Sequence, residues 1–168
     1  LPDGKEDFEL TDEGSIDKYL GVMIKDIDKN RFEMSQPFLI KRILDFLSLD
    51  ENKTKARDTP VGKPLLNKDL NGVPRKHEWV YRGAVGMLSY LCNSVRPEIS
   101  MAVHQTARFS VNPMRSHELA INRIGRYLVN DPDRGMIYTV DKSKGLEVYV
   151  DADFAGGWSS ADSASADN

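Results

Sequence analysis

Apolar residues recur at helical spacing from Trp79 to Leu128, and this pattern constrains the fold more than any other feature of the chain. A first helix is predicted from Trp79 to Val95, because its apolar residues fall on one face. Pro97 then interrupts the pattern, and proline suits the first turn of a second helix. A third helix is predicted from Ser116, a favourable N-cap residue. The three apolar faces comprise Tyr81, Ala84, Val85, Leu88, Leu91, Cys92 and Val95; Ile99, Ala102, Val103 and Thr106; and Ala120, Ile124, Tyr127 and Leu128.

The residues before these helices predict a β-hairpin at 17–34. Apolar and polar residues alternate on both sides of the turn-rich residues 28–30. The alternating apolar residues are Leu20, Val22, Ile24, Phe32 and Met34. Gly21 lies inside the first predicted strand, where a glycine marks either a bulge or a close approach of another group to the backbone.

A further helix is predicted from Pro37 to Leu49, and its broad apolar stripe implies burial on more than one side. Residues 50–76 are polar and rich in proline and glycine, so we expect a long linker or a loosely packed crossing segment there. Beyond the helices, 135–140 and 146–150 predict two strands. The order of these elements predicts an α+β fold.

The composition excludes several classes of protein. With 168 residues and 40% apolar content, the chain can form one domain with a core or two small ones. No apolar run approaches the roughly 20 residues of a membrane helix, and no signal peptide is recognisable. Cys92 is alone and therefore cannot form an internal disulfide. We expect a cytoplasmic or nuclear protein that is neither secreted nor embedded in a membrane.

Charge is unevenly distributed along the chain. The formal net charge is −3, yet residues 75–134 contain nine Lys/Arg against five Asp/Glu, which leaves +4 there and −7 elsewhere. A basic centre with acidic flanks fits a surface that faces a polyanion, and it equally fits a solvated helical surface. The Ser/Ala/Asp-rich tail after Trp158 is predicted to be disordered for lack of apolar residues.

Four blocks of sequence carry a family resemblance. The first combines Asp12-Glu13-Gly14, Tyr19-Leu20-Gly21-Val22 and Ser35-Gln36-Pro37-Phe38-Leu39-Ile40. The second is Tyr81-Arg82-Gly83-Ala84-Val85-Gly86-Met87-Leu88-Ser89-Tyr90-Leu91, and the third runs from Arg96-Pro97-Glu98-Ile99 to Arg126-Tyr127-Leu128. The last is Asp151-Ala152-Asp153-Phe154-Ala155-Gly156. In this order and spacing, they resemble the later part of the Pol polyprotein of copia-type retrotransposons.

The resemblance implies a division of the chain into four parts. Residues 1–35 correspond to the end of the reverse-transcriptase palm with a primer-grip-like hairpin, and 36–76 to a thumb-like helix and linker. Residues 77–134 correspond to a helical connection segment, and 135–168 to the first strands of a truncated ribonuclease H-like sheet with its tail. The paired-aspartate turn of the polymerase site has no counterpart here, because the sequence contains no Asp-Asp pair.

Two groups of site residues follow from the resemblance. Tyr19, Leu20 and Gly21 correspond to the primer grip, where glycine admits a sugar-phosphate backbone and an aromatic ring can stack on a sugar or base. The alternative is an ordinary hairpin that packs Leu20 and Val22 into a core. Candidate phosphate contacts are Arg82, Arg96, Arg108, His117, Arg123 and Arg126. Each of these arginines also fits a helix-surface charge or an ion-pair partner.

Asp151 and Asp153 are the catalytic candidates of an incomplete ribonuclease H site. The resemblance implies that Asp151 is the first Mg²⁺ ligand of the intact parent enzyme, whereas an Asp that closes a strand is otherwise a turn residue. The two carboxylates share a face if the strand continues through Asp153, and they diverge if it turns at Ala152. One carboxylate binds Mg²⁺ weakly, so no metal is expected for this chain alone.

The sequence thus predicts a fragment of a retrotransposon reverse transcriptase and ribonuclease H that helps to grip the RNA/DNA primer–template duplex. The parent is an RNA-directed DNA polymerase, and the chain by itself is predicted to be inactive. Its expected partners are the duplex and the missing palm and ribonuclease H segments. The alternative is a stand-alone helical protein-interaction module without nucleic-acid function. In that case the helix at 37–49 would drive self-association through an exposed apolar face.

Overall fold

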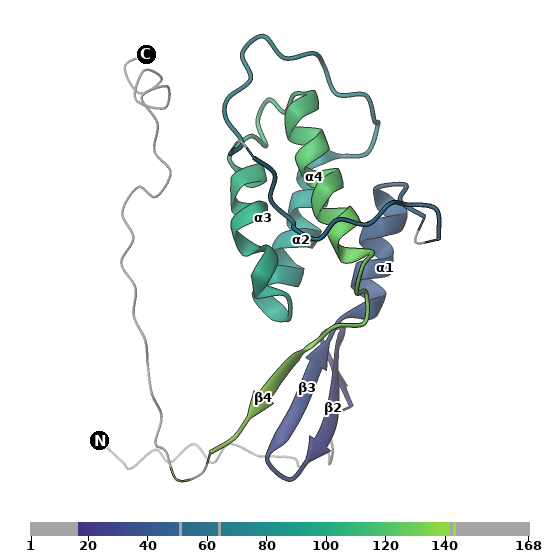
Figure 1. Ribbon diagram of the computed structural model, residues 1–168, viewed down its shortest axis with the longest axis vertical. Coiled ribbons are helices and arrows are strands. Elements are labelled where there is room, and N and C mark those ends of the chain that lie inside the picture. The colour runs from purple at the N-terminus through teal and green to yellow at the C-terminus, as the bar shows by residue number, and fades with distance from the viewer. Residues whose placement is uncertain (1–16, 51, 64, 142, 144–168) are drawn as a thin grey trace, which may run out of the picture.

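The structure is a computed structural model that describes residues 17–50, 52–63, 65–141 and 143. Figure 1 shows four helices gathered in one part of the molecule and an antiparallel sheet that projects away from them. Helix α1 (Pro37–Phe46) follows the hairpin directly, and the chain returns to the sheet after α4 (Arg115–Leu128) (Figure 1). This architecture agrees with the predicted α+β class.

The helices lie where the apolar spacing predicts them. They are α1 (Pro37–Phe46), α2 (Tyr81–Ser94), α3 (Ser100–Ala107), which follows the short 3₁₀ helix η1 (Pro97–Ile99), and α4 (Arg115–Leu128). All four contribute to one core, so α1 is not a separate unit. The largest fully buried apolar side chains are Ile40, Ile43, Leu44, Leu47, Leu88, Leu91, Ile99, Ile121, Ile124 and Leu128.

Burial corrects part of the predicted face of α4. Ala120 and Tyr127 are only half-buried, whereas Ile121 and Gly125 are buried. A Cβ on Gly125 would lie 2.5 Å from a methyl carbon of Leu49, so the absence of a side chain lets the end of the α1 segment pack against α4. The predicted N-cap is also wrong, because Ser116 lies inside the first turn and Met114 is the N-cap. His117 fills the capping role instead, since its Nδ1 accepts a 2.9 Å hydrogen bond from the Met114 backbone N–H.

The sheet has the strand order β1-β2-β3-β4, with β1 at Lys18–Tyr19, β2 at Val22–Asp28, β3 at Arg31–Ser35 and β4 at Met136–Thr139. Gly21 therefore lies between strands and not inside one. Leu20 and Gly21 have φ values of 48° and 80°, and positive φ at both central residues is the pattern of a type I′ hairpin turn. The predicted hairpin turn at residues 28–30 is confirmed, because β2 and β3 pair from Met23↔Ser35 to Asp28↔Arg31.

Strand β4 differs from its predicted place. The resemblance implies that residues 135–140 begin a ribonuclease H-like sheet, and in the structure Met136–Thr139 pairs with β3 and extends the hairpin sheet. Phe32 and Tyr138 stack across this pairing with ring centroids 5.2 Å apart. Such cross-strand aromatic contacts favour the pairing of two strands far apart in the sequence. The second predicted strand, 146–150, lies outside the described residues.

The segment between α1 and α2 is irregular, as its proline and glycine content predicts, but it packs closely on the helices. The Arg57 backbone N–H donates to the Arg126 carbonyl (3.0 Å), and the Arg115 backbone N–H donates to the Val73 carbonyl (3.0 Å). Its path over α4 is visible in Figure 1. The segment therefore fits the predicted crossing segment better than the predicted linker.

Candidate nucleic-acid interface

The turn at Leu20–Gly21 is exposed and held against α2. The side chains of Tyr19 and Leu20 are 63% and 71% exposed, so the alternative in which Leu20 enters the core is wrong, whereas Val22 is buried. The Tyr90 hydroxyl of α2 donates a 2.7 Å hydrogen bond to the Leu20 carbonyl. A Cβ on Gly21 would meet no atom within 4 Å, which leaves the backbone there open to an incoming group.

A cavity of about 460 Å³ lies between this turn, the start of α1 and the middle of α2. Its lining, hereafter the turn pocket, comprises Lys18, Leu20, Gly21, Gln36, Phe38, Leu39, Arg42, Gly86, Met87 and Tyr90. Lys18 and Arg42 are both exposed, and none of these lining residues is acidic. Lys18 also lies over the Phe38 ring, with Nζ 5.5 Å from its centroid. Cations beside exposed rings form a surface that suits phosphates and bases.

Two of the predicted phosphate contacts are buried and have structural partners. Arg96 is 1% exposed, its Nε lies 2.5 Å from a Glu98 carboxylate oxygen, and it donates to the Asp131 carbonyl (2.9 Å). His117 is equally buried and stacks on Phe109 with the ring centroids 4.2 Å apart. Since Nδ1 of His117 accepts a backbone hydrogen bond, its Nε2–H is the donor to a backbone carbonyl 3.0 Å away. Neither side chain reaches a ligand at the surface.

The other four arginines lie at the surface in two places. Arg82 on α2 donates to the Ser110 carbonyl (3.1 Å), which brings it beside the turn that follows the exposed Arg108. Arg123 donates to the carbonyl of Thr59 (3.1 Å), and Arg126 donates to the carbonyl of Lys55 (2.7 Å). The structure therefore does not gather the predicted arginines into one patch.

Arg123 and Arg126 also line a second cavity of about 340 Å³ between α3, α4 and the crossing segment. Arg57 contributes a third guanidinium to its lining. Because Arg123 and Arg126 each donate to a backbone carbonyl of the crossing segment, their first role is to hold that segment on α4. The sequence offered a surface charge or an ion pair as the alternative for these arginines, and neither describes hydrogen bonds to backbone carbonyls.

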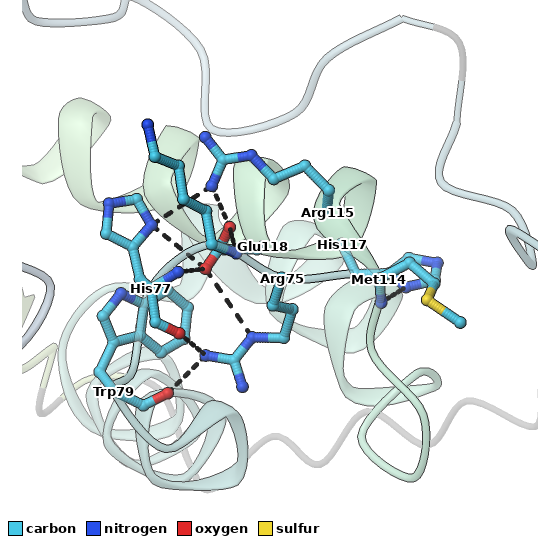
Figure 2. A network of polar contacts seen from close by, with 8 residues as sticks. Arg75, His77, Trp79, Met114, Arg115, His117 and Glu118 are labelled. Carbon is cyan, nitrogen blue, oxygen red and sulfur yellow. Dashed lines mark hydrogen bonds and ion pairs between the residues drawn. The ribbon is translucent and has the colours of Figure 1, made fainter. Parts of the chain in front are cut away.

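A buried carboxylate fixes the end of the crossing segment. Glu118 on α4 accepts hydrogen bonds from the backbone N–H groups of Lys76 (3.1 Å) and His77 (2.8 Å), and the Arg115 guanidinium pairs with it. Figure 2 shows Glu118 between Arg75, His77 and Arg115. Burial opposes ionisation of this carboxyl, but the hydrogen bonds from these N–H groups and Arg115 outweigh it and lower the pKa of Glu118 to about 2.

Sequence reasoning missed Lys18, Gln36, Arg42, Tyr90 and Glu118. Tyr90 could have been recognised from the sequence, because it is a polar aromatic residue on the face of α2 opposite the apolar stripe. No sequence pattern identifies Gln36 and Arg42, since their place in the pocket lining depends on how α1 packs against the turn at Leu20–Gly21. Glu118 reads as an ordinary first-turn acid, and only the fold places it under residues 75–77.

The metal prediction falls on residues that the structure does not describe, because Asp151 and Asp153 lie in 144–168. Among the described residues, no three His, Cys, Asp or Glu side chains come together in a way that could hold a metal ion. None of the described helices is both long and apolar enough to cross a bilayer.

Comparison with known proteins finds relatives among the Pol polyproteins of transposons. The Pol polyprotein of transposon RE2 from Arabidopsis thaliana is 40% identical over 153 residues, and that of transposon RE1 from the same plant is 32% identical over 150 residues. The chain is homologous to a segment of retrovirus-related Pol polyproteins from transposons. Each alignment covers 89% of this chain and 10% of the relative, so the chain spans about a tenth of the length of these polyproteins.

A shorter relative shows the same association with transposons. A transposon Ty5-1 protein from Saccharomyces cerevisiae is 28% identical over 148 residues, which cover 86% of this chain and 46% of the relative. No family model matches the chain, and no solved structure matches it significantly. The homology therefore supports a retrotransposon polyprotein segment, as the four sequence blocks predict.

Proposed function

We propose that the chain is the part of a copia-type Pol polyprotein that joins reverse transcriptase to ribonuclease H, and that it grips the primer–template duplex. The observation that carries this proposal is the exposed type I′-like turn at Leu20–Gly21 beside Lys18 and Arg42. An open backbone flanked by two cations and by the Tyr19 ring is suited to a sugar-phosphate backbone. The homology to transposon Pol polyproteins supports the same assignment.

Phosphate contacts by lysine and arginine provide affinity without base preference, which suits a protein that must accept any template. Lys18 and Arg42 supply such contacts at the turn, and Arg82 and Arg108 supply a second place of contact at the end of α3. The Mg²⁺-dependent synthesis and hydrolysis belong to the intact polyprotein in this proposal. Asp151, with Asp153 beside it, would be the first nuclease ligand there.

Fluorescence anisotropy with a labelled RNA/DNA hybrid duplex tests the proposal. We expect the affinity to fall steeply between about 50 and 200 mM salt, because bound counterions are released from the phosphates. The salt slope is the slope of log affinity against log salt concentration. The double variant Lys18→Gln/Arg42→Gln should reduce its magnitude by about 2, one for each lost phosphate contact. The matched control, Lys25→Gln/Lys29→Gln, removes two exposed charges from β2 and its turn, and should leave the slope unchanged.

Binding that does not depend on salt would instead support the protein-interaction module. The structure offers little apolar surface for such a module on α1. Ile40, Ile43, Leu44 and Leu47 are at most 1% exposed, and Phe38 is the large apolar side chain of this helix that stays exposed, at 65%. The apolar stripe of α1 is therefore taken up by the core of the chain itself, so duplex binding is the better supported function.

A further inference from the structure

Three arginines line one cavity, and none of the residues that line it is acidic. Arg57, Arg123 and Arg126 belong to the cavity of about 340 Å³ between α3, α4 and the crossing segment, hereafter the arginine pocket. None of the three forms an ion pair with a described residue. Charges of one sign that line a cleft concentrate ions of the opposite sign. The arginine pocket therefore attracts an anion.

The fold holds these arginines together and leaves donors free on them. The Arg57 backbone N–H donates to the Arg126 carbonyl (3.0 Å), which brings the two backbones into contact. Arg123 bonds to Thr59 through Nε and Nη2, and Arg126 bonds to the Lys55 carbonyl through Nε. A guanidinium carries more N–H donors than these bonds use. The exposed Arg57 side chain has no hydrogen bond to a described residue, so all of its donors remain.

Apolar side chains from all three elements form much of the remaining lining. Val61 and Leu66 come from the crossing segment, Ala102 from α3, and Leu119 and Ala120 from α4. Leu119 is 51% exposed although it lines the pocket. A pocket of this size that combines apolar walls with a few polar groups is the ordinary form of a small-molecule site.

The two ends of the arginine pocket differ in charge. Along α4 the lining extends from Ser116 to Arg126, about 15 Å at the rise of an α-helix. At the first end, the Ser116 hydroxyl bonds to the Asp69 carboxylate (2.7 Å), which disfavours an anion there. At the other end, Arg123 and Arg126 lie one helical turn apart, and planar guanidinium groups suit a phosphate or a carboxylate. The occupant should therefore have an anionic group at one end and an apolar body.

We propose that the arginine pocket binds a small organic anion. Its phosphate or carboxylate is held by Arg57, Arg123 and Arg126, and its apolar body lies against Leu119 and Ala120. Because the lining comes from the crossing segment as well as from α3 and α4, such a ligand fastens that segment to the helices. The site is independent of the proposed grip of the duplex, since it shares no lining residue with the turn pocket.

Calorimetric titration of the full chain with phenyl phosphate and with phenylacetate tests the proposal. Inorganic phosphate and phenol are the comparison compounds, because the first lacks the apolar body and the second lacks the anionic group. We expect an organic anion to bind at least about tenfold more tightly than either comparison compound. The tighter of the two organic anions identifies the group that the arginines prefer. If neither organic anion binds more tightly than both comparison compounds, the proposal is overturned.

Two variants locate the ligand. Arg57→Gln removes a guanidinium that bonds to no described residue, so the fold should persist while the affinity for the organic anion falls about tenfold. Ala120→Leu fills the apolar part of the pocket, keeps every arginine, and should weaken binding by a similar factor. The matched control Arg134→Gln removes an exposed arginine outside the pocket and should leave the affinity unchanged. If Arg57→Gln or Ala120→Leu binds as tightly as the unaltered chain, this site is overturned.

Hydrogen exchange at the Arg57 backbone N–H gives a second readout, because this group bonds to the Arg126 carbonyl. With the tighter organic anion at 100 times its Kd, exchange at Arg57 should slow by up to about 100-fold. The Arg115 backbone N–H, which bonds to the Val73 carbonyl outside the pocket, should slow much less. Equal slowing at the two amides, or slowing at neither, would overturn the fastening of the crossing segment.

Discussion

The hydroxyl of Tyr90 donates a 2.7 Å hydrogen bond to the carbonyl oxygen of Leu20, 70 residues earlier in the chain. This bond joins the exposed turn between β1 and β2 to α2. The turn has few buried contacts of its own, because Leu20 and Tyr19 are both exposed. Together with the buried Val22 and the contact of Lys18 with the Phe38 ring, this hydrogen bond holds the turn against the helices.

Replacing Tyr90 with phenylalanine should free the turn without unfolding the protein. We expect faster amide hydrogen exchange at residues 20–22, with a loss of about 1 kcal/mol or less in the free energy of unfolding. Tyr19→Phe is the matched control, since the Tyr19 hydroxyl is exposed and forms no hydrogen bond to a described residue. Equal exchange rates in the two variants would contradict this role of Tyr90.

Two glycines that border the turn pocket should respond oppositely to alanine. Neither position has a neighbour within 4 Å of an added Cβ, but Gly21 has φ +80° whereas Gly86 lies inside α2. Gly21→Ala should lower the free energy of unfolding by about 1–2 kcal/mol, because a side chain strains the left-handed conformation. Gly86→Ala should raise it by up to about 1 kcal/mol through helix propensity. Urea denaturation measures both, and a stabilised Gly21→Ala would refute the turn geometry.

The variants Arg96→Met and Arg108→Met should distinguish an arginine that stabilises the fold from one that contacts the duplex. Arg96→Met leaves Glu98 and the Asp131 carbonyl without their guanidinium partner, so we expect a loss of about 2 kcal/mol or more in stability. Arg108 is exposed and donates a 3.4 Å hydrogen bond to the Gln105 side chain, so Arg108→Met should cost less stability than Arg96→Met. In the duplex assay the order reverses, since only Arg108→Met should reduce the salt slope, by about 1. Similar stability losses in the two variants would contradict this division.

Glu118 should make the fold sensitive to acid. Its pKa in the folded protein, about 2, lies below the ordinary value of 4.5, so its contribution to stability is fully present above pH 4.5. That contribution is lost as the pH falls through about 2, and it amounts to roughly 3 kcal/mol. Glu118→Gln should be less stable at neutral pH and should show a flatter dependence on pH below 4.5. Denaturant unfolding at several pH values tests this, and an unchanged acid profile would contradict it.

Several features of the fold follow from local sequence pattern. The apolar spacing predicts α2, α3 and α4, and Pro37 and Pro97 open α1 and η1 as proline geometry requires. The hairpin around residues 28–30 is equally local, because alternation and turn residues specify it together. Such predictions succeed since the interactions concerned lie within a few residues of each other.

The incorrect predictions from the sequence have a different cause. Ser116 satisfies the N-cap preference, yet α4 begins earlier, because His117 caps the Met114 backbone while Ser116 bonds to Asp69 in the crossing segment. Arg96 and His117 read as surface cations and are instead buried beside Glu98 and Phe109. In each case a partner distant along the chain, or a packing neighbour, changes the role of a side chain whose local preference is ordinary.

By itself, the sequence determined the elements, their order and the resemblance to transposon Pol polyproteins, because these depend on periodicity and on short motifs. Only the tertiary structure decided that Met136–Thr139 joins the hairpin sheet and that Glu118 pairs with the backbone of residues 76–77. It alone decided that Leu20, Lys18 and Arg42 line one pocket. These relationships depend on contacts between residues far apart in the chain, and their energies arise only once the helices pack and exclude water.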